Sequence, residues 1–149
     1  NILLIRIQNF GLNSYAVKQK SKKKKDINFS PLTFIIDDFK VLVGKNNKQN
    51  DYLTLKYAKK NDIWLHTKDI HGSHVIIETN GLNPSFETIK SVAIITAKHS
   101  QAKFSSKVPV DYTQVKYVKK PSGSKPGMVI YTNYKTIYVN LQNDLESED

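Results

Sequence analysis

The sequence contains no cysteine, only one arginine and no long apolar run. The absence of cysteine excludes a structural disulfide and a thiolate zinc site, and it fits the reducing conditions of the cytoplasm. The apolar run at residues 2–5 stops at Arg6, which is far too short for a membrane span or a signal-peptide core. We therefore expect a cytoplasmic protein without a membrane partner, and the first residue, Asn1, suggests a piece of a longer chain.

Several catalytic signatures are also missing. The chain has no Gly-x-Ser-x-Gly turn, no cysteine nucleophile and no kinase-like motif, so a nucleophilic enzyme has little support. The segment at residues 119–127 contains glycines and lysines but lacks the phosphate-loop pattern of nucleotide-binding proteins, so ATP binding is not expected. We predict no enzymatic activity, no catalytic residue, no metal and no cofactor.

Lysine is what the chain has in excess. Its 23 lysine and arginine residues outnumber 13 acidic residues and leave a formal charge of +10. Polyanions are the leading partner class, because phosphate contacts release condensed counterions and need no sequence readout. Residues 40–135 hold 16 lysines and 6 acidic residues, so the surplus lies in the centre of the chain, and the lysine-rich run at residues 18–25 is offset within the terminal segments.

A length of 149 residues suits one ordinary domain, which can bury roughly two thirds of the surface of its unfolded chain. Composition divides the chain into three expected segments. Residues 1–30 are expected to be a basic linker or the remnant of a preceding helical region, residues 31–141 the folded domain, and residues 142–149 an acidic tail.

Apolar alternation predicts seven strands, and the apolar stripes of two further segments predict helices. One helix is expected to start at the N-cap Asn50 and end near Lys60, and the other to run from Pro84 to about His99. The hairpin-like order favours an α+β domain with a mixed, mainly antiparallel sheet over a doubly wound one. The strands are expected at residues 32–36, 40–43, 62–66, 74–78, 113–118, 128–132 and 136–139, with hairpin turns at 37–39 and 133–135.

Three histidines lie within nine positions, at His66, His71 and His74. Together with Asp69 they could form a metal site, because neutral imidazole binds zinc and a nearby carboxylate can orient the ring. Two histidines and Lys68 would also satisfy the inventory of a ribonuclease site, in which one ring takes a proton and another donates one. More often such histidines are hydrogen-bonding residues at a sheet edge.

Trp64 shares a strand face with His66 in the predicted alternation. It either stacks on an unpaired base or belongs to the core, and we favour the core. His66 lies nearer the end of the strand and is the better candidate for contact with a ligand.

Three basic polar stretches are candidates for contact with phosphate. The loop at residues 44–50 enters a predicted helix, where backbone N–H groups and the helix dipole favour an anion. The stretch at residues 119–127 combines lysines with glycines that permit close backbone approach, and a third stretch lies at residues 98–107. Three such stretches around one small domain favour a binding surface.

Ordered motifs over most of the chain resemble a known family. They are VGKNNKQND at residues 43–51, DIWLHTKD at 62–69, GSHVII at 72–77, VPVDYT at 108–113, VKKP at 118–121 and KPG at 125–127. Together they closely resemble the NFACT-R domain, the RNA-binding module of the NFACT family of ribosome-associated quality-control factors, which are often labelled fibronectin-binding proteins in bacteria.

The resemblance implies that the parent protein engages a large ribosomal subunit with an obstructed nascent chain and recruits tRNA. It also implies that a C-terminal tail is added without a template, with help from other domains of the same full-length protein. We therefore expect an RNA-binding module for tRNA or large-subunit rRNA. The expected site comprises Lys45, Asn46, Asn47 and Asn50 at the helix start, then His66, Lys68, Asp69, Ser73 and His74, and finally Lys98, Lys103, Lys119, Lys120 and Lys125.

Two alternative functions stay open at this point. The family's bacterial label suggests a surface adhesin that binds fibronectin, which we disfavour. The histidine cluster leaves open a small histidine-dependent ribonuclease.

Overall fold

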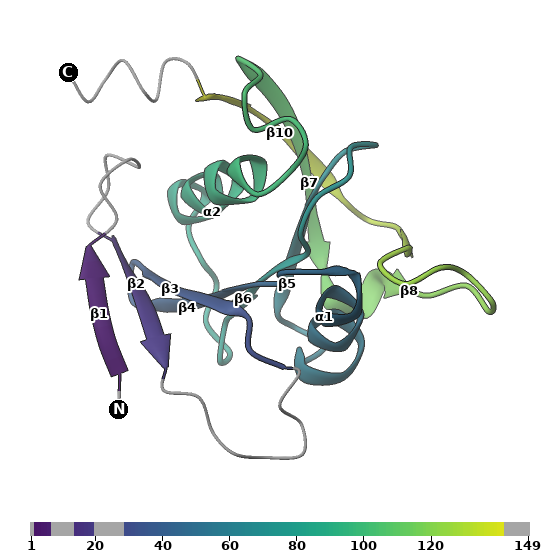
Figure 1. Cartoon of the computed structure of the whole chain (residues 1–149), viewed down its shortest axis with the longest axis horizontal. Coiled ribbons are helices and arrows are strands. Elements are labelled where there is room, and N and C mark those ends of the chain that lie inside the picture. Colours follow the sequence, from purple (N-terminus) through teal and green to yellow (C-terminus); the bar gives the residue numbers. More distant parts are fainter. Residues whose placement is uncertain (1, 7–13, 20–28, 142–149) are drawn as a thin grey trace.

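The structure is a computed structural model that describes residues 2–6, 14–19 and 29–141 (Figure 1). Within these ranges, eight strands form one sheet in the order β1-β2-β3-β4-β6-β5-β7-β10, and every neighbouring pair is antiparallel. The bounds are β1 Ile2–Arg6, β2 Ser14–Gln19, β3 Leu32–Ile36, β4 Phe39–Val43, β5 Ile63–Thr67, β6 Val75–Glu78, β7 Lys107–Gln114 and β10 Lys135–Asn140. A second sheet pairs β8 Val118–Lys119 with β9 Ile130–Tyr131.

Helices cover both faces of the main sheet, which confirms the α+β class. The helix α2, Phe86–Lys98, lies in the angle where the sheet curls from β3 and β4 towards β7 and β10 (Figure 1). The helix α1, Asn47–Tyr52, continues into a π-helical turn, Leu53–Tyr57, on the opposite face. No helix within the described ranges is long and apolar enough to cross a bilayer.

Strand alternation separates the apolar residues into two cores. On the α2 face, Leu65 and Val75 pack with Val92 and other apolar residues of the helix. On the other face, Trp64 and Leu53 belong to the second core, beneath α1 and the small sheet. Since neighbouring strand residues point to opposite faces, Leu65 and Trp64 enter different cores, as the sequence pattern predicts.

The β3–β4 hairpin is confirmed at the position that the sequence predicts. Its turn is Asp37-Asp38, with φ of 50° and 70°, and Ile36 pairs with Phe39 across it. Positive φ at both central residues is typical of a type I′ turn, whose twist matches that of the flanking strands, and aspartate tolerates this conformation better than most residues.

The segment expected to be a linker or helical remnant contains two strands instead. β1 pairs with β2, and β2 extends the main sheet by pairing with β3. The expectation of helix is therefore wrong for these strands, while the division of the chain into three segments stays a prediction. The lysines at residues 20–25 and the acidic tail at 142–149 lie outside the described residues.

The strand β7 begins at Lys107, six residues before the predicted start at residue 113. Pro109 weakens the strand signal, because proline cannot donate to a ladder. In the structure the β5–β7 ladder ends at the pair of Thr67 and Val110, so Pro109 lies one residue beyond it. Its carbonyl accepts a hydrogen bond from Lys68 N at 2.9 Å. The missing N–H therefore interrupts no pair of that ladder.

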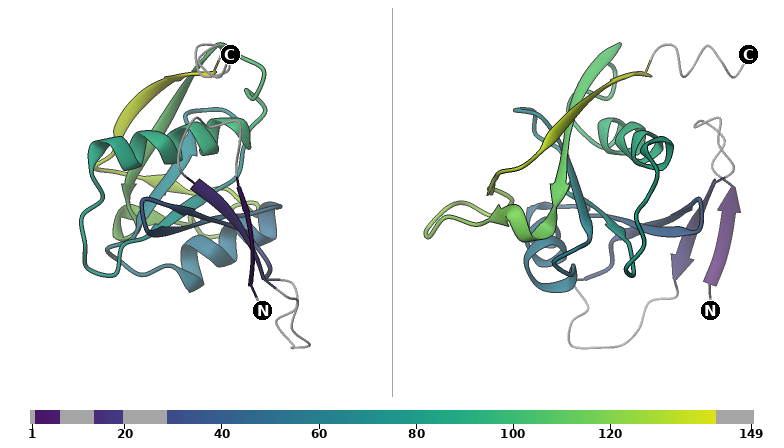
Figure 2. Two further views of the ribbon diagram at one scale, coloured as in Figure 1. Left: turned by 90° about the vertical axis from the view of Figure 1, so that its left-hand side faces the viewer. Right: turned by 180° about the vertical axis from the view of Figure 1, so that it is seen from behind.

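The hairpin expected between residues 128–132 and 136–139 is wrong. β9 pairs with β8, whereas β10 pairs with β7 at the edge of the main sheet. The chain changes sheet near Asn133, where φ is 55°, and Thr113 Oγ1 donates hydrogen bonds to the carbonyls of Thr132 and Asn133. The loop between β8 and β9 projects from the body of the domain (Figure 2).

Candidate functional site

A hollow of about 1660 Å³ lies between the start of α1, the end of β5 and the loop before β9. We call it the first hollow. Lys45, Asn46, Asn47 and Lys48 line its α1 side, and residues 125–129 line the loop side. Its lining also includes the rings of Phe29, Tyr52, Trp64, His66 and Tyr131. Basic and aromatic groups therefore meet in one cleft.

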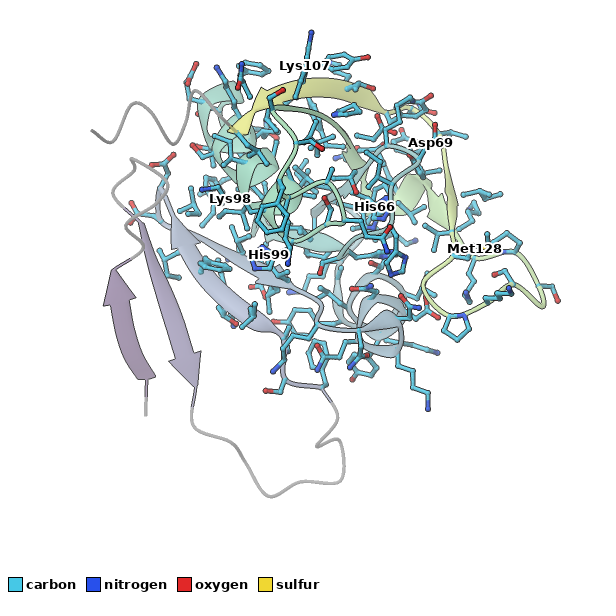
Figure 3. The ribbon with its side chains drawn as sticks, turned by 45° about the horizontal axis from the view of Figure 1, so that its top comes forward. His66, Asp69, Lys98, His99, Lys107 and Met128 are labelled. Atoms are coloured by element: carbon cyan, nitrogen blue, oxygen red, sulfur yellow. The ribbon has the colours of Figure 1, made fainter. Side chains whose placement is uncertain are left out.

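A second hollow of about 440 Å³ adjoins the first. It is lined by Ser73, Lys98 and Lys103, and it shares Lys45 to Asn47 with the first hollow. In Figure 3, His66 lies between His99 at the end of α2 and Met128 of the projecting loop. Segments far apart in the sequence thus form one continuous surface with the 45–47 loop at its centre.

The helix α1 starts four residues earlier than predicted, because its N-cap is Asn46. Asn46 has extended backbone angles, and its Oδ1 accepts a hydrogen bond from Gln49 N at 2.8 Å. Gln49 Oε1 in turn accepts from Lys45 N at 2.8 Å. These reciprocal bonds resemble a capping box shifted by one residue, so part of the helix start is already occupied by side chains of the loop itself.

Asn50 is not a surface contact, because it is buried inside the helix with 3% exposure. Its Oδ1 accepts a hydrogen bond from His74 N at 3.1 Å and thereby joins α1 to the start of β6. The prediction of Asn50 as N-cap and phosphate contact is therefore wrong. Two asparagines four positions apart both fit the pattern of a cap, and only the packing against His74 separates their roles.

Substituting Gly44 by alanine is expected to lower the free energy of unfolding by about 1–3 kcal/mol. A Cβ at Gly44 would lie 2.0 Å from Asn50 Oδ1 and would displace the acceptor of the His74 N–H. Urea unfolding of the single and double variants measures the effect. Because Asn50→Ala removes the clashing oxygen, Gly44→Ala should cost much less in that background, and equal costs in both backgrounds would contradict the clash.

The His74 side chain is buried, with 1% exposure, so it has a structural role and does not contact a ligand at the surface. Its Nδ1 lies 3.1 Å from Trp64 Nε1, which donates to it, and 2.8 Å from Thr54 Oγ1. Its Nε2 lies 3.1 Å from the carbonyl of Gly127, so the Nε2–H tautomer satisfies all three contacts. Burial lowers the pKa of His74 to about 3, so the ring is neutral at physiological pH.

His66 lies beside His74 and borders the first hollow. The two ring centroids are 5.4 Å apart, and His66 stacks on Trp64 at 5.7 Å with planes inclined by 16°. Burial also lowers the pKa of His66. His66 and His74 do lie side by side, as a ribonuclease site would require. Both ring nitrogens of His74 are occupied by hydrogen bonds within the domain, however, which disfavours the hypothesis of a ribonuclease. In the part of the chain that the structure describes, no three His, Asp or Glu side chains are grouped to hold a metal.

Gly127 anchors the projecting loop to the domain. Its N–H donates to Asp51 Oδ1 at 2.9 Å, and its carbonyl contacts the His74 ring. Its φ is 86°, and a Cβ there would lie 2.7 Å from Asn47 Oδ1. A residue without a side chain is therefore required at this position, and the anchored loop forms one wall of the first hollow.

Lys120 holds this loop in place. Its Nζ donates to the carbonyls of Lys125 at 2.6 Å and Met128 at 3.0 Å, and it lies 3.4 Å from Asp51 Oδ2. The structure thus gives Lys120 an internal role in the loop, whereas the prediction assigned it to electrostatic support. Lys119 is exposed on β8 and lies outside the lining of both hollows.

Lys68 is engaged away from the hollows. Its Nζ lies 3.4 Å from the Tyr134 hydroxyl and 3.5 Å from Asp111 Oδ2, and the first of these contacts is the main cause of its raised pKa. Asp111 is completely buried and also accepts from Tyr131 at 2.5 Å and Thr136 at 2.6 Å. This network fixes Tyr131, which forms part of the wall of the first hollow.

A family model described as the NFACT protein RNA binding domain matches residues 17–133. The chain belongs to this family. The resemblance that the sequence motifs indicate is thereby confirmed.

Individual relatives agree with this assignment. The chain is 47% identical over 130 residues to Rqc2 homolog RqcH of Bacillus subtilis (strain 168), a match covering 85% of the chain and 22% of the relative. The protein of the same name from Streptococcus suis (strain 05ZYH33) is 43% identical over 130 residues, which cover 86% of the chain and 23% of the relative. The chain thus spans about a fifth of these curated relatives.

A solved structure of the C-terminal of the fibronectin/fibrinogen-binding protein from Streptococcus suis also matches. It has a TM-score of 0.72 and 41% identity, and the match covers 87% of this chain and 51% of that one. The fold described above is therefore shared with a solved relative of considerable sequence identity.

In this NFACT domain, the hollows bring together nine of the predicted site residues and add others that the sequence did not indicate. Tyr131 and Met128 line the first hollow, yet their positions give no local signal, because the loop reaches α1 through contacts of Gly127 and Lys120 with Asp51, which is far away in the sequence. The predicted residues at the hollows, apart from the buried Asn50 and His74, are Lys45, Asn46, Asn47, His66, Asp69, Ser73, Lys98, Lys103 and Lys125.

Proposed function

We propose that this domain binds structured RNA, either tRNA or rRNA of the large ribosomal subunit. The observation that carries the proposal is the continuity of the two hollows across the 45–47 loop, which aligns lysines from three separate stretches. Phosphates attract such a surface without any sequence readout. The family assignment gives the same class of ligand.

We further propose that the domain serves as one module of a cytoplasmic ribosome quality-control factor that supports template-independent tailing. The relatives named Rqc2 homolog support the placement in that pathway. Because the chain spans about a fifth of those relatives, tailing would need other domains of the full-length protein, and this module would contribute RNA binding without catalysis.

In this proposal, lysines that line the two hollows contact phosphates. Lys45 and Lys125 flank the first hollow from opposite walls, and Lys98 with Lys103 extend the track into the second. Asn46 and Asn47, both exposed, supply polar groups to ribose or phosphate where the hollows meet. Lys68 and Lys120 act indirectly, because their ammonium groups hold the walls.

Replacing Lys45 and Lys125 together by glutamate is expected to weaken binding of tRNA by about 10- to 100-fold at moderate salt. Two lost phosphate contacts should also make the slope of log affinity against log salt less steep by about two. Fluorescence anisotropy with labelled tRNA across a salt series measures both quantities. The matched control is Lys107→Glu with Lys135→Glu, which makes the same change of charge at exposed positions outside both hollows. Equal losses in the two double variants, or an affinity independent of salt, would contradict the proposed surface.

A second candidate function is binding of fibronectin, which the name of the solved streptococcal relative favours. The two functions differ in whether tRNA competes for the surface and in whether Lys45 and Lys125 are needed. Fibronectin binding that persists in excess tRNA and in the Lys45→Glu, Lys125→Glu variant would favour the adhesin, whereas we expect retention on immobilised fibronectin to be absent or abolished by tRNA.

A further inference from the structure

His66 presents a ring whose orientation is set by buried neighbours. Trp64, with 0% exposure, lies under the imidazole at 5.7 Å and nearly parallel to it, and His74 meets it at 72°. Trp64 is itself fixed by the bond from its Nε1 to His74 Nδ1. The His66 ring is therefore held in one orientation at the wall of the first hollow before any ligand binds.

The surroundings of this ring suit a flat, uncharged group. Burial lowers the pKa of His66, so the imidazole is neutral and offers phosphate no cationic charge. Tyr131, whose ring lies 4.6 Å from that of Trp64, and Met128 from the projecting loop line the same hollow. Aromatic rings and a thioether contact the face of a nucleobase favourably, and such stacking tolerates any base.

The opposite charges in the first hollow come from different walls, with lysines on the α1 and loop walls and a carboxylate on the turn after β5. Lys45, Lys48 and Lys125 are exposed and lie on the α1 and loop walls. Asp69, on the turn after β5, is the one acidic residue among the described residues that line this hollow. Figure 3 shows Asp69 on the same side of the domain as His66.

A carboxylate repels phosphate but accepts hydrogen bonds from the N–H groups of a base. Guanine presents two such donors side by side on its Watson–Crick edge, whereas uracil presents one beside two carbonyls. A base inserted between the lysines and Asp69 would therefore be favoured when it is guanine. A paired stem hides these edges and base faces, so it can reach the rim lysines but not His66.

We propose that the first hollow is a subsite for one unpaired RNA base, preferably guanine, which stacks on His66 and meets Asp69 while Lys45, Lys48 and Lys125 hold the flanking phosphates. The inference rests on the proposed function and deepens it, because it separates a base-reading pocket from the phosphate track.

The test uses the full 149-residue chain with two RNAs of equal length and charge. One is a hairpin with 2-aminopurine at a single loop position, and the other is a fully paired duplex that contains the same analogue. We expect the hairpin to bind about tenfold more tightly than the duplex and its 2-aminopurine emission to fall on binding, as stacking quenches it. His66→Ala should remove both effects, whereas His66→Phe, the matched control that keeps a ring, should retain them.

A hairpin series with guanine or uracil at the same loop position tests Asp69. We expect guanine to bind several-fold more tightly, and Asp69→Ala to remove that difference while the rim lysines keep the RNA bound. Salt-dependent binding with no preference for the hairpin and no effect of His66→Ala would overturn the base subsite and leave the proposed function standing. No binding of either RNA would overturn both, and equal affinity for guanine and uracil would overturn the role of Asp69.

Discussion

Replacing His74 by alanine is expected to lower the free energy of unfolding by about 3–5 kcal/mol, which is a large share of the stability of a small domain. The change leaves the Trp64 Nε1–H, the Thr54 hydroxyl and the Gly127 carbonyl without their partner. Each buried polar group left unpaired costs about 1–3 kcal/mol, and the vacated ring adds a cavity. Urea unfolding followed by fluorescence measures the loss, since Trp64 is the only tryptophan of the chain.

The same histidine predicts a dependence of stability on pH. Burial lowers its pKa from 6.5 to about 3, so the unfolded chain takes up a proton below pH 6.5 while the folded domain does not. Stability is therefore present above pH 6.5 and is lost as the pH falls towards 3, by up to about 1.4 kcal/mol per pH unit. His66, whose pKa burial also lowers, adds a loss of the same sign.

Unfolding curves collected between pH 7 and pH 4 test this dependence. The slope of stability against pH should be smaller in His74→Ala than in the parent chain. The matched control for stability is His71→Ala, which removes an exposed histidine three positions away and should leave the free energy of unfolding at pH 7 nearly unchanged. A slope that is the same in His74→Ala as in the parent chain would contradict the assignment.

Local signals account for what the sequence predicts correctly. The Asp37-Asp38 hairpin needs only two residues that tolerate positive φ between two apolar runs. Alternation alone places Trp64 and His66 on one strand face, and it separates Trp64 from the core on the α2 side. The family motifs add the class of ligand, since ordered matches along the chain are more specific than any one of them.

Contacts between distant residues account for what the sequence misses. Asn46 and Asn50 both suit a helix cap, and the choice depends on His74, which lies 24 residues beyond Asn50. His74 in turn bonds to Gly127, which is 53 residues away. Charge counting cannot distinguish lysines at the rim from Lys120, whose ammonium group is bound to loop carbonyls. The composition of the surface is therefore predictable, but the assembly of the hollows is not.

Replacing Asp111 by alanine is expected to lower the free energy of unfolding by about 3 kcal/mol and to weaken RNA binding indirectly. The carboxylate is completely buried and accepts hydrogen bonds from Tyr131 and Thr136 at 2.5 and 2.6 Å. Hydrogen bonds to a charged acceptor contribute about 1.5–3 kcal/mol each, and the removal of desolvation offsets part of that sum. Tyr131 would also lose the partner that fixes it at the wall of the first hollow.

The matched control is Lys68→Ala, which removes the other partner of Asp111 but leaves both hydroxyl bonds intact. The Lys68 ammonium is half-buried and lies 3.5 Å from Asp111 Oδ2, which is longer than either hydroxyl bond, so its removal should destabilise the domain less than removal of the carboxylate does. Burial and the bond to Asp111 raise the pKa of Tyr131, so the folded domain keeps this proton above pH 10 while the unfolded chain loses it. The free energy of unfolding should therefore be independent of this group below pH 10 and should fall as the pH rises above 10. Tyr131→Phe should make that fall with pH smaller. If Asp111→Ala destabilises the domain no more than Lys68→Ala does, the buried carboxylate does not hold this wall.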